Sequence, residues 1–482
     1  MQSSAAGARS ESPTLETEPA SAHPQRTLSE HAAQWMLGLS YEGLPADVMH
    51  ATRSRVLDII GLALAGAMRD PARSVYRASA ELGSGHDSRL IYYGNVTSAP
   101  IAALVNGTMA HSLEFDDTHN ETIVHVSVPL VTTALALGDK QDTGLHEIIT
   151  AIAGAAELAT RIAVIAPGQL NRHGYHPTGI VGTMSATYLA SCLMGLSVDE
   201  TRHAVGIAGS QAAGLMECWS DGTWSKFLHP GLSAQAAITA ATLARAGFTG
   251  PATVFEGRFG LFRSHVQDPA FTLDFPRMLA GLGGEWESRN ISFKPYPCGH
   301  VIHPFLDALF HLYREEGLRA ENVKTILCPI ADYMVPIVCE PVAEKLAPAS
   351  DWQGRVSLQY SLAETLYRGR CDVHSYDEAS LHDPGILDLA RRVTYTIDKE
   401  APGRRQFKGW VIVETRDGRR LERIQPHNWG SRKNPMTESD IENKFHTNAG
   451  DAFDVRRRNA VVEFMRRAEN VAIRDLVSLC IR

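Results

Sequence analysis

Residues 111–125, HSLEFDDTHNETIVH, place three histidines beside the carboxylates of Glu114, Asp116 and Asp117. Buried charges must be paired or change their protonation state, so such a segment is either a solvated loop or a chemical site. Both flanking stretches are apolar, and a surface loop between two buried helices would also explain the pattern. Imidazole and carboxylate groups are sound metal ligands, so a metal site remains an alternative, although we predict none. Its ligands would come from His111, Asp116, Asp117, His119 and His125.

A second group of residues surrounds three His-Pro dipeptides. His176, His229 and His303 each precede a proline that is predicted to open a helix. Proline is favourable just inside a helix start, so these dipeptides could serve only to begin helices. However, Lys226 lies three residues before His229, and Lys294 lies nine before His303. Because helix N-termini attract anions, a Lys and a His at such a terminus form a carboxylate receptor.

These groups suit the binding of a di- or tricarboxylate and proton transfer next to one of its carboxylates. Elimination of water, decarboxylation and epimerisation all develop negative charge at carbon, which fixed positive donors stabilise. No cofactor is needed for such reactions. The sequence contains no GxxxxGK[ST], HExxH or GxSxG motif, so nucleotide, metalloprotease and hydrolase functions lack support. A non-catalytic helical scaffold is the alternative from another class.

The elements that must position these residues change along the chain. From Ser29 to about residue 251 the apolar residues follow helical spacing and are rich in Ala and Gly, which predicts a closely packed helical bundle. After about residue 265, β-branched runs predict strands at 323–330 and 392–398 and a hairpin over 409–425 around Asp417-Gly418. Thr437, followed by Asp440, predicts the start of a further helix.

The composition excludes several classes of function. The chain has 482 residues, 44% of them hydrophobic, and a formal net charge of −8, which argues against nucleic acid as its main partner. Seven scattered cysteines without a CxxC pair favour a reducing, cytoplasmic location. No apolar run is long enough to cross a membrane. We expect a disordered tail over 1–28, a helical domain over 29–265, a smaller domain over 266–430, and C-terminal helices over 431–482 that return to the helical domain.

Several ordered motifs together resemble the MmgE/PrpD family, from about residue 29 to the C-terminus. They are AHSLEFDDTH, GYHPTGIVGT, SKFLHPGLSAQAA, KPYPCGHVIHPFLDAL, VPIVCEP and NPMTESDIENKF. The family includes 2-methylcitrate dehydratase, cis-aconitate decarboxylase and iminodisuccinate epimerase. The resemblance implies a mainly α fold, with a large all-helical domain and a smaller α+β lid domain, usually assembled as a homodimer.

The resemblance also implies an active-site cleft between the two domains. Its catalytic residues would be His125, His176, Lys226, Lys294 and His303. The groups binding the substrate would be Glu114, Asp116, Asp117, Thr118, His229 and Tyr333. By analogy, a His or Lys removes a proton next to a carboxylate while the other cations hold the substrate.

Two positions depart from the family pattern. Glu114 stands where the family usually has aspartate, and Val126 stands where proline often follows the histidine. A longer side chain shifts the carboxylate by about an ångström, enough to alter substrate geometry. We therefore expect a cofactor-independent lyase, with dehydration of a citrate-like polycarboxylate favoured. Decarboxylation of a cis-aconitate-like substrate, or epimerisation of a dicarboxylate, is the alternative.

Overall fold

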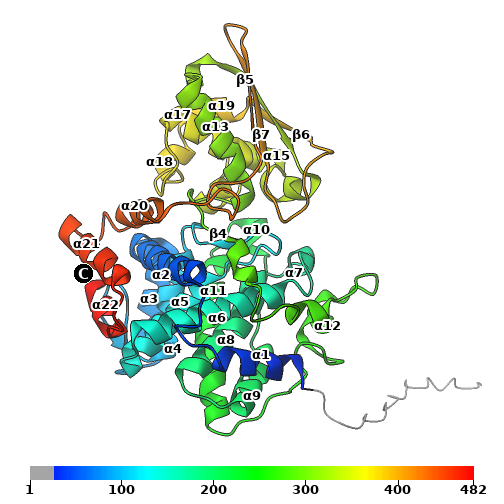
Figure 1. Cartoon of the computed structure of the whole chain (residues 1–482). Coiled ribbons are helices and arrows are strands. Elements are labelled where there is room, and N and C mark those ends of the chain that lie inside the picture. The colour runs from blue at the N-terminus through cyan, green and yellow to red at the C-terminus, as the bar shows by residue number, and fades with distance from the viewer. Residues whose placement is uncertain (1–25) are drawn as a thin grey trace, which may run out of the picture.

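The computed structural model describes residues 26–482, so the expected tail lies almost wholly outside the described residues. The first part of the chain forms a large helical domain, which lies below the smaller domain in Figure 1. Its helices are α1 (Leu28–Leu37), α2 (Ala46–Gly66), α3 (Asp70–Leu82), α4 (Ala99–His111), α5 (Ser127–Gln141), α6 (Leu145–Ala163), α7 (Gln169–Arg172), α8 (Pro177–Leu193), α9 (Val198–Gly209), α10 (Cys218–Asp221), α11 (Ser225–Arg245) and α12 (Leu261–Val266).

Small residues determine how closely the central helices approach. Helix α11 packs against α4 and α8. A Cβ atom placed on Gly107 of α4 would come within 2.6 Å of the Gly231 Cα of α11. The two backbones therefore touch, and larger side chains at this crossing would separate the helices. The predicted bundle of helices rich in Ala and Gly is present.

The smaller domain is built on a four-stranded sheet with the order β6-β5-β7-β8. Strands β5 and β6 are parallel, and β7 and β8 form an antiparallel hairpin around Gly418, whose φ is 89°. The predicted strands and hairpin are therefore present. The elements are α13 (His303–Glu315), β5 (Val323–Ile330), α14 (Val335–Val338), α15 (Val342–Leu346), α16 (Asp351–Arg355), α17 (Leu358–Arg368), α18 (Glu378–Leu381), α19 (Pro384–Ala390), β6 (Val393–Ile397), β7 (Gly409–Thr415) and β8 (Arg420–Gln425).

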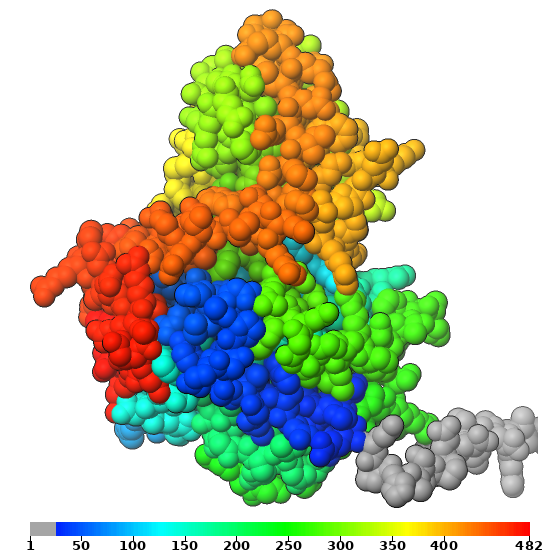
Figure 2. Space-filling view, viewed as in Figure 1, coloured from blue at the N-terminus to red at the C-terminus, as the bar shows by residue number. Residues whose placement is uncertain are grey.

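The chain then returns to the helical domain. Residues 426–437, which we call the return segment, lead into α20 (Glu438–Asn448), α21 (Val455–Arg466) and α22 (Ile473–Leu479). Thr437 caps α20 in a reciprocal hydrogen-bonded pair with Asp440, as predicted. Figure 2 shows the orange C-terminal part of the chain lying across the junction between the two domains.

Each domain has its own apolar core. The first core joins the helical domain to Phe445, Phe464 and other residues of the C-terminal helices, and the second lies within the smaller domain. The predicted class, mainly α with a large all-helical domain and a smaller α+β domain, is confirmed. Among the described residues, no helix is long and apolar enough to cross a membrane.

One helix start was predicted wrongly. His176 caps α8 and His303 begins α13, but α11 begins at Ser225, so Pro230 lies inside the helix and His229 is not at its N-terminus. Proline in the second turn of a helix removes only one backbone hydrogen bond, which tertiary packing can outweigh. His229 therefore gains no anion-binding helix terminus.

Candidate active site

The segment 111–125 connects α4 to α5 at the boundary of the helical domain. Within it, β3 (Thr118–His119) pairs with β4 (Ile291–Ser292), just before the chain enters the smaller domain. All of its residues are buried except Glu121 and Ile123, which are half-buried. The segment is therefore not the solvated loop that was one alternative. Glu114 and Ile123 also have positive φ angles, of 52° and 56°, a strain that is typical of functional segments.

Glu114 lies at the centre of the charged cluster. Its carboxylate accepts hydrogen bonds from the ammonium groups of Lys226 and Lys294, the second at 3.2 Å. Lys294 also donates to the Glu114 backbone carbonyl at 2.9 Å. Burial raises the pKa of Glu114, but the two lysines outweigh burial and hold it well below its ordinary value. Three distant parts of the chain thus meet at one ionised carboxylate.

His125 is held beside this carboxylate as a neutral ring. Its Nδ1–H donates to the Asp117 carbonyl at 3.1 Å, which leaves Nε2 facing a Glu114 carboxylate oxygen at 3.5 Å. Its backbone N–H donates to the Thr178 hydroxyl at 2.9 Å. Burial lowers the pKa of His125 to about 3, although Asp116 acts in the opposite direction. At neutral pH, Nε2 is therefore a free proton acceptor.

Two further histidines, His111 and His176, lie beside His125 in the charged cluster. His111 donates from Nδ1 to both oxygens of Asp116 at 3.0 Å, and its Nε2 is buried without a partner. His176 has its Nδ1 at 3.0 Å from Nδ1 of His229, and its Nε2 is likewise unpartnered. Burial, reinforced by Lys226 and His229, lowers the pKa of His176 well below its ordinary value. Two unpartnered ring nitrogens therefore lie in the cluster.

Asp117 and Thr118 lie beside His125 and order the chain around it. Asp117 accepts hydrogen bonds from the Ser127 backbone N–H, at 2.9 Å, and from the Ser127 hydroxyl. Arg55 of α2 places its Nε 3.5 Å from the same carboxylate. The Thr118 hydroxyl lies 3.4 Å from His125 Nδ1. Asp117 therefore fixes the start of α5, directly after His125.

The sequence analysis missed three buried charged residues around this segment, Arg55, Asp58 and Lys444. Lys444 of α20 lies 2.8 Å from the Asp58 carboxylate and donates to the Phe115 carbonyl at 2.9 Å. Burial raises the pKa of Asp58 to about 6, and Lys444 only partly offsets it. The available signal was a charged residue inside an apolar helical run, as in RVLDIIGLAL.

His303 and Tyr333 make no hydrogen bond or ion pair with Glu114 among the described residues, although after burial the Lys294 charge is the largest influence that lowers the pKa of His303. His303 donates from Nε2 to the Cys298 carbonyl at 3.2 Å and contacts the ring of His300, with ring centroids 4.7 Å apart. Tyr333 lines a different cavity, of about 890 Å³, where the Arg404 guanidinium lies 4.7 Å from its ring centre. No hydrogen bond or ion pair joins either residue to the cluster among residues 26–482.

The cluster can bind an anion and exchange a proton. The Lys294 side chain is fully buried and that of Glu114 is 8% exposed, so a substrate reaches them only after part of the structure moves. His111, His125 and His176 could hold a metal ion, because one ring nitrogen of each lies within 4.8 Å of the others. This set differs from the ligands of the alternative metal site, since His119 instead contacts Thr122 and Glu287.

Comparisons with known proteins match both halves of the chain. Residues 30–274 match the MmgE/PrpD N-terminal domain, and residues 296–468 match the MmgE/PrpD C-terminal domain. A cis-aconitate decarboxylase of Aspergillus terreus is 28% identical over 451 residues, covering 89% of this chain and 91% of that protein. The cis-aconitate decarboxylase of Homo sapiens is 26% identical over 463 residues, covering 92% of each chain. A 2-methylcitrate dehydratase of Cupriavidus necator is 23% identical over 389 residues, covering 75% and 78%.

Proposed function

Because the chain belongs to the MmgE/PrpD family, we propose that it is a lyase that decarboxylates a cis-aconitate-like polycarboxylate. The sequence alone favours dehydration. We take decarboxylation as the first candidate, because relatives named cis-aconitate decarboxylase match about nine-tenths of the chain at 25–28% identity. Dehydration is the second candidate, and the similarity to a 2-methylcitrate dehydratase is the observation that favours it.

The observation that most supports a polycarboxylate substrate is the convergence of Lys226 and Lys294 on one carboxylate. That carboxylate belongs to Glu114 itself, so the pair already has the geometry that binds such a group. The two ammonium groups carry one more positive charge than Glu114 neutralises, and the ionised Asp116 lies close enough for Lys294 to help lower its pKa. A substrate carboxylate placed beside the lysines would compete with Asp116 for this charge.

Decarboxylation has two steps, cleavage of the C–C bond and protonation of the carbon, and the charged cluster can assist both. Breaking the C–C bond releases carbon dioxide and leaves the electron pair on carbon, delocalised toward a neighbouring carboxylate, where the lysines stabilise it. The carbon then takes a proton. His176 and His111 each direct an unpartnered Nε2 into the cluster. Such a nitrogen can take a proton from solvent and give it to the carbon, which returns the ring to its starting form. In dehydration, His125 Nε2 is the group suited to removing the proton.

The test is incubation of the purified protein with cis-aconitate, 2-methylcitrate and citrate, followed by proton NMR and carbon dioxide detection. We expect carbon dioxide from cis-aconitate, and equal activity after prolonged chelation because no resident metal is proposed. Water loss from 2-methylcitrate would favour the second candidate. Deuterium exchange next to a carboxylate without turnover would indicate an epimerase. No change in any substrate, even with a large excess of protein, would contradict the proposal and favour a scaffold.

The proposal includes a cytoplasmic location and a homodimer. The seven cysteines, which form no disulfide among the described residues, support the first point. For the second, Leu232 and Leu243 lie three turns apart on α11 and are 41% and 38% exposed, an apolar surface that a partner could cover. Light scattering of the full chain should give twice the mass of one chain.

A further inference from the structure

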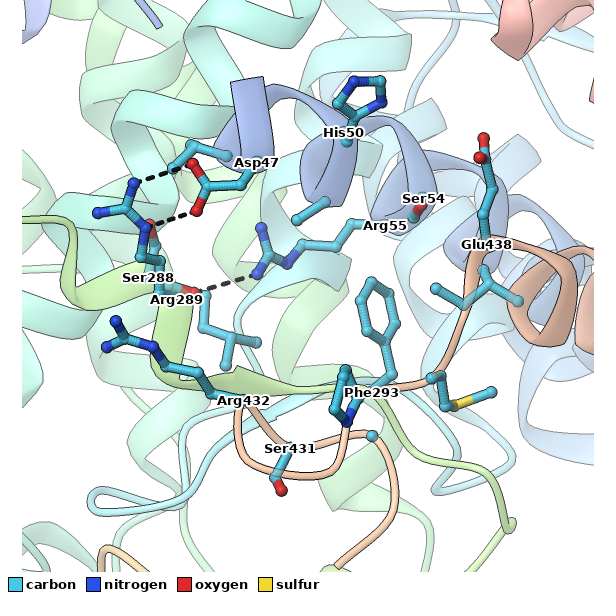
Figure 3. Close-up of a pocket in the computed structure, with 17 residues that line it drawn as sticks. Asp47, His50, Ser54, Arg55, Ser288, Arg289, Phe293, Ser431, Arg432 and Glu438 are labelled. Carbon is cyan, nitrogen blue, oxygen red and sulfur yellow. Dashed lines mark hydrogen bonds and ion pairs between the residues drawn. The ribbon is translucent and has the colours of Figure 1, made fainter. Parts of the chain in front are cut away.

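A separate cavity of about 460 Å³ lies between α2 and the return segment. Figure 3 shows its interior, with Arg55 reaching from α2 across the space toward Ser288. Phe293, Met436 and Ile441 form an apolar wall. None of Glu114, Lys226 and Lys294 lines this cavity, so it is distinct from the proposed active site.

One end of this cavity is rich in arginine. Arg55, Arg289 and Arg432 gather there, while Glu438 stands at the opposite end (Figure 3). Arg289 is paired with Asp47 at 2.6 and 2.9 Å, but the Arg432 side chain has no ion pair or hydrogen bond within residues 26–482. Arg289 and Arg432 also line a second cavity, of about 590 Å³, together with Arg161, Arg277 and Arg405. Glu157 and Glu121 pair with the other three arginines, and Asp117 faces Arg55, so Arg432 supplies the positive charge at this end that has no paired carboxylate among the described residues.

Three buried polar atoms around the cavity have no hydrogen-bond partner. They are Arg55 Nε, Ser288 Oγ and Ser431 Oγ, each on a residue that lines the cavity. Arg55 is 3% exposed, and its Nε faces Asp117 at 3.5 Å. Buried polar atoms without a partner are costly and uncommon, and several around one cavity indicate a polar occupant. Hydroxyl and guanidinium groups are the donors that carboxylate and phosphate oxygens accept.

We propose that this cavity binds a small organic anion, with its carboxylate or phosphate group at Arg289 and Arg432 and its apolar body against Phe293 and Met436. The occupant contacts both the helical domain and the return segment, because the lining residues come from both. Only Arg55 separates the occupant from the segment 111–125, because the Arg55 side chain lines the cavity and also contacts Asp117. This site is additional to the lyase function and does not depend on it.

Calorimetric titration of the full chain tests this proposal with benzoate and phenyl phosphate, and with benzyl alcohol as the uncharged control. We expect one of the two anions to bind and the alcohol to bind at least about tenfold more weakly. The tighter anion distinguishes a carboxylate ligand from a phosphate ligand. Arg432→Gln should weaken binding of this anion about tenfold, because the anion loses a charged hydrogen-bond donor. Folding should be unaffected, because the exposed Arg432 side chain has no partner among the described residues. Lys433→Gln is the matched control, since Lys433 is exposed and adjacent but does not line the cavity.

Two further variants complete the test. Arg289→Gln should also weaken binding, whereas Lys226→Met, which changes the proposed active site and not this cavity, should leave the affinity for the anion unchanged. Binding that is equal in Arg432→Gln, Arg289→Gln and Lys433→Gln would overturn the proposal, as would a loss of affinity in Lys226→Met. Failure of both anions to bind would mean that the cavity holds only water, and the proposal would be wrong. None of these outcomes requires lyase activity.

Discussion

At the scale of single residues, Glu114 sets the charge balance of the buried cluster that we propose as the active site. Two ammonium groups share its carboxylate, and its backbone adopts a strained positive φ to place it there. A buried carboxylate with two ammonium donors stays in place, because displacing it would leave a buried charge without a partner. Glu114, which stands where the resemblance leads us to expect Asp, therefore lies at the centre of the charged cluster.

We predict that Glu114→Gln lowers the free energy of unfolding by about 3–5 kcal/mol, because two buried ammonium groups lose their counter-ion. Citrate should restore more stability to this variant than to the wild type, since its carboxylate can supply the missing negative charge beside the lysines. Urea unfolding with and without citrate measures both effects. Glu469→Gln, at an exposed position, is the control. Equal stabilisation of both proteins by citrate would argue against an anion site at the lysine pair.

The second prediction concerns Lys226. Its ammonium group stabilises negative charge only if the substrate reacts beside Glu114, so Lys226→Met should lower kcat/KM about 10²- to 10³-fold. The measurement uses the substrate identified in the NMR assay, with Lys433→Met as control. A variant that folds normally and keeps full activity would remove Lys226 from the reaction.

Residue types and a family resemblance predict that His125, Lys226 and Lys294 are catalytic, because all three stand in recognisable motifs, and this role stays a prediction. The structure brings these three to Glu114. Arg55 and Lys444 could not be predicted in the same way. Each is a single charge in a helix, and its importance arises only from a partner far away in the chain.

At the scale of elements, α20 ties the end of the chain to the segment 111–125. Lys444 projects from α20 to the Asp58 carboxylate of α2 and to the Phe115 carbonyl. All three residues are buried. A helix from the C-terminal end of the chain thus supports the backbone between Glu114 and Asp116.

We predict that Lys444→Met destabilises the protein by about 3–5 kcal/mol, because Asp58 is left as a buried carboxylate without its cation. Adding Asp58→Asn should recover part of this loss, since the second change removes the unpaired charge. A double-mutant cycle in urea measures the coupling. If the two single losses simply add in the double variant, the pair is not an energetic unit.

At the scale of the whole molecule, the helical domain holds an unusual number of neutral buried histidines. Burial lowers the pKa of His125 to about 3, of His229 to about 4 and of His303, at the start of the smaller domain, to about 3. An unfolded histidine titrates near about 6.5, so below that pH the unfolded chain binds more protons than the folded chain. His176 and His300, whose pKa values burial also lowers, act in the same direction. Burial raises the pKa of Asp58 to about 6 and that of Glu364 to about 9, and it also raises the pKa of Asp117 and Asp307, so these four carboxyl groups oppose the effect of the five histidines.

The contribution of these histidines to the free energy of unfolding should therefore be fully present above about pH 7 and decrease as the pH falls from about 6.5 toward 4. We expect the unfolding free energy to decrease by more than about 1 kcal/mol between pH 7 and pH 5. Urea midpoints measured across this range provide the test. A midpoint that is constant, or that rises with acidity, would mean that these histidines are protonated in the folded protein.

The sequence by itself determined the helices, the strands of the smaller domain and the family. Apolar spacing, caps such as Thr437 and turns such as Asp417-Gly418 act within a few residues, so they can be read locally. Only the tertiary structure decided which charges share a partner. Glu114 lies 112 positions from Lys226 and 180 from Lys294, and no local pattern states that their side chains meet. The tertiary structure also placed His229 in contact with His176 and Tyr333 in a separate cavity. It formed the arginine-rich cavity beside Arg55 as well, because packing between distant segments sets those distances.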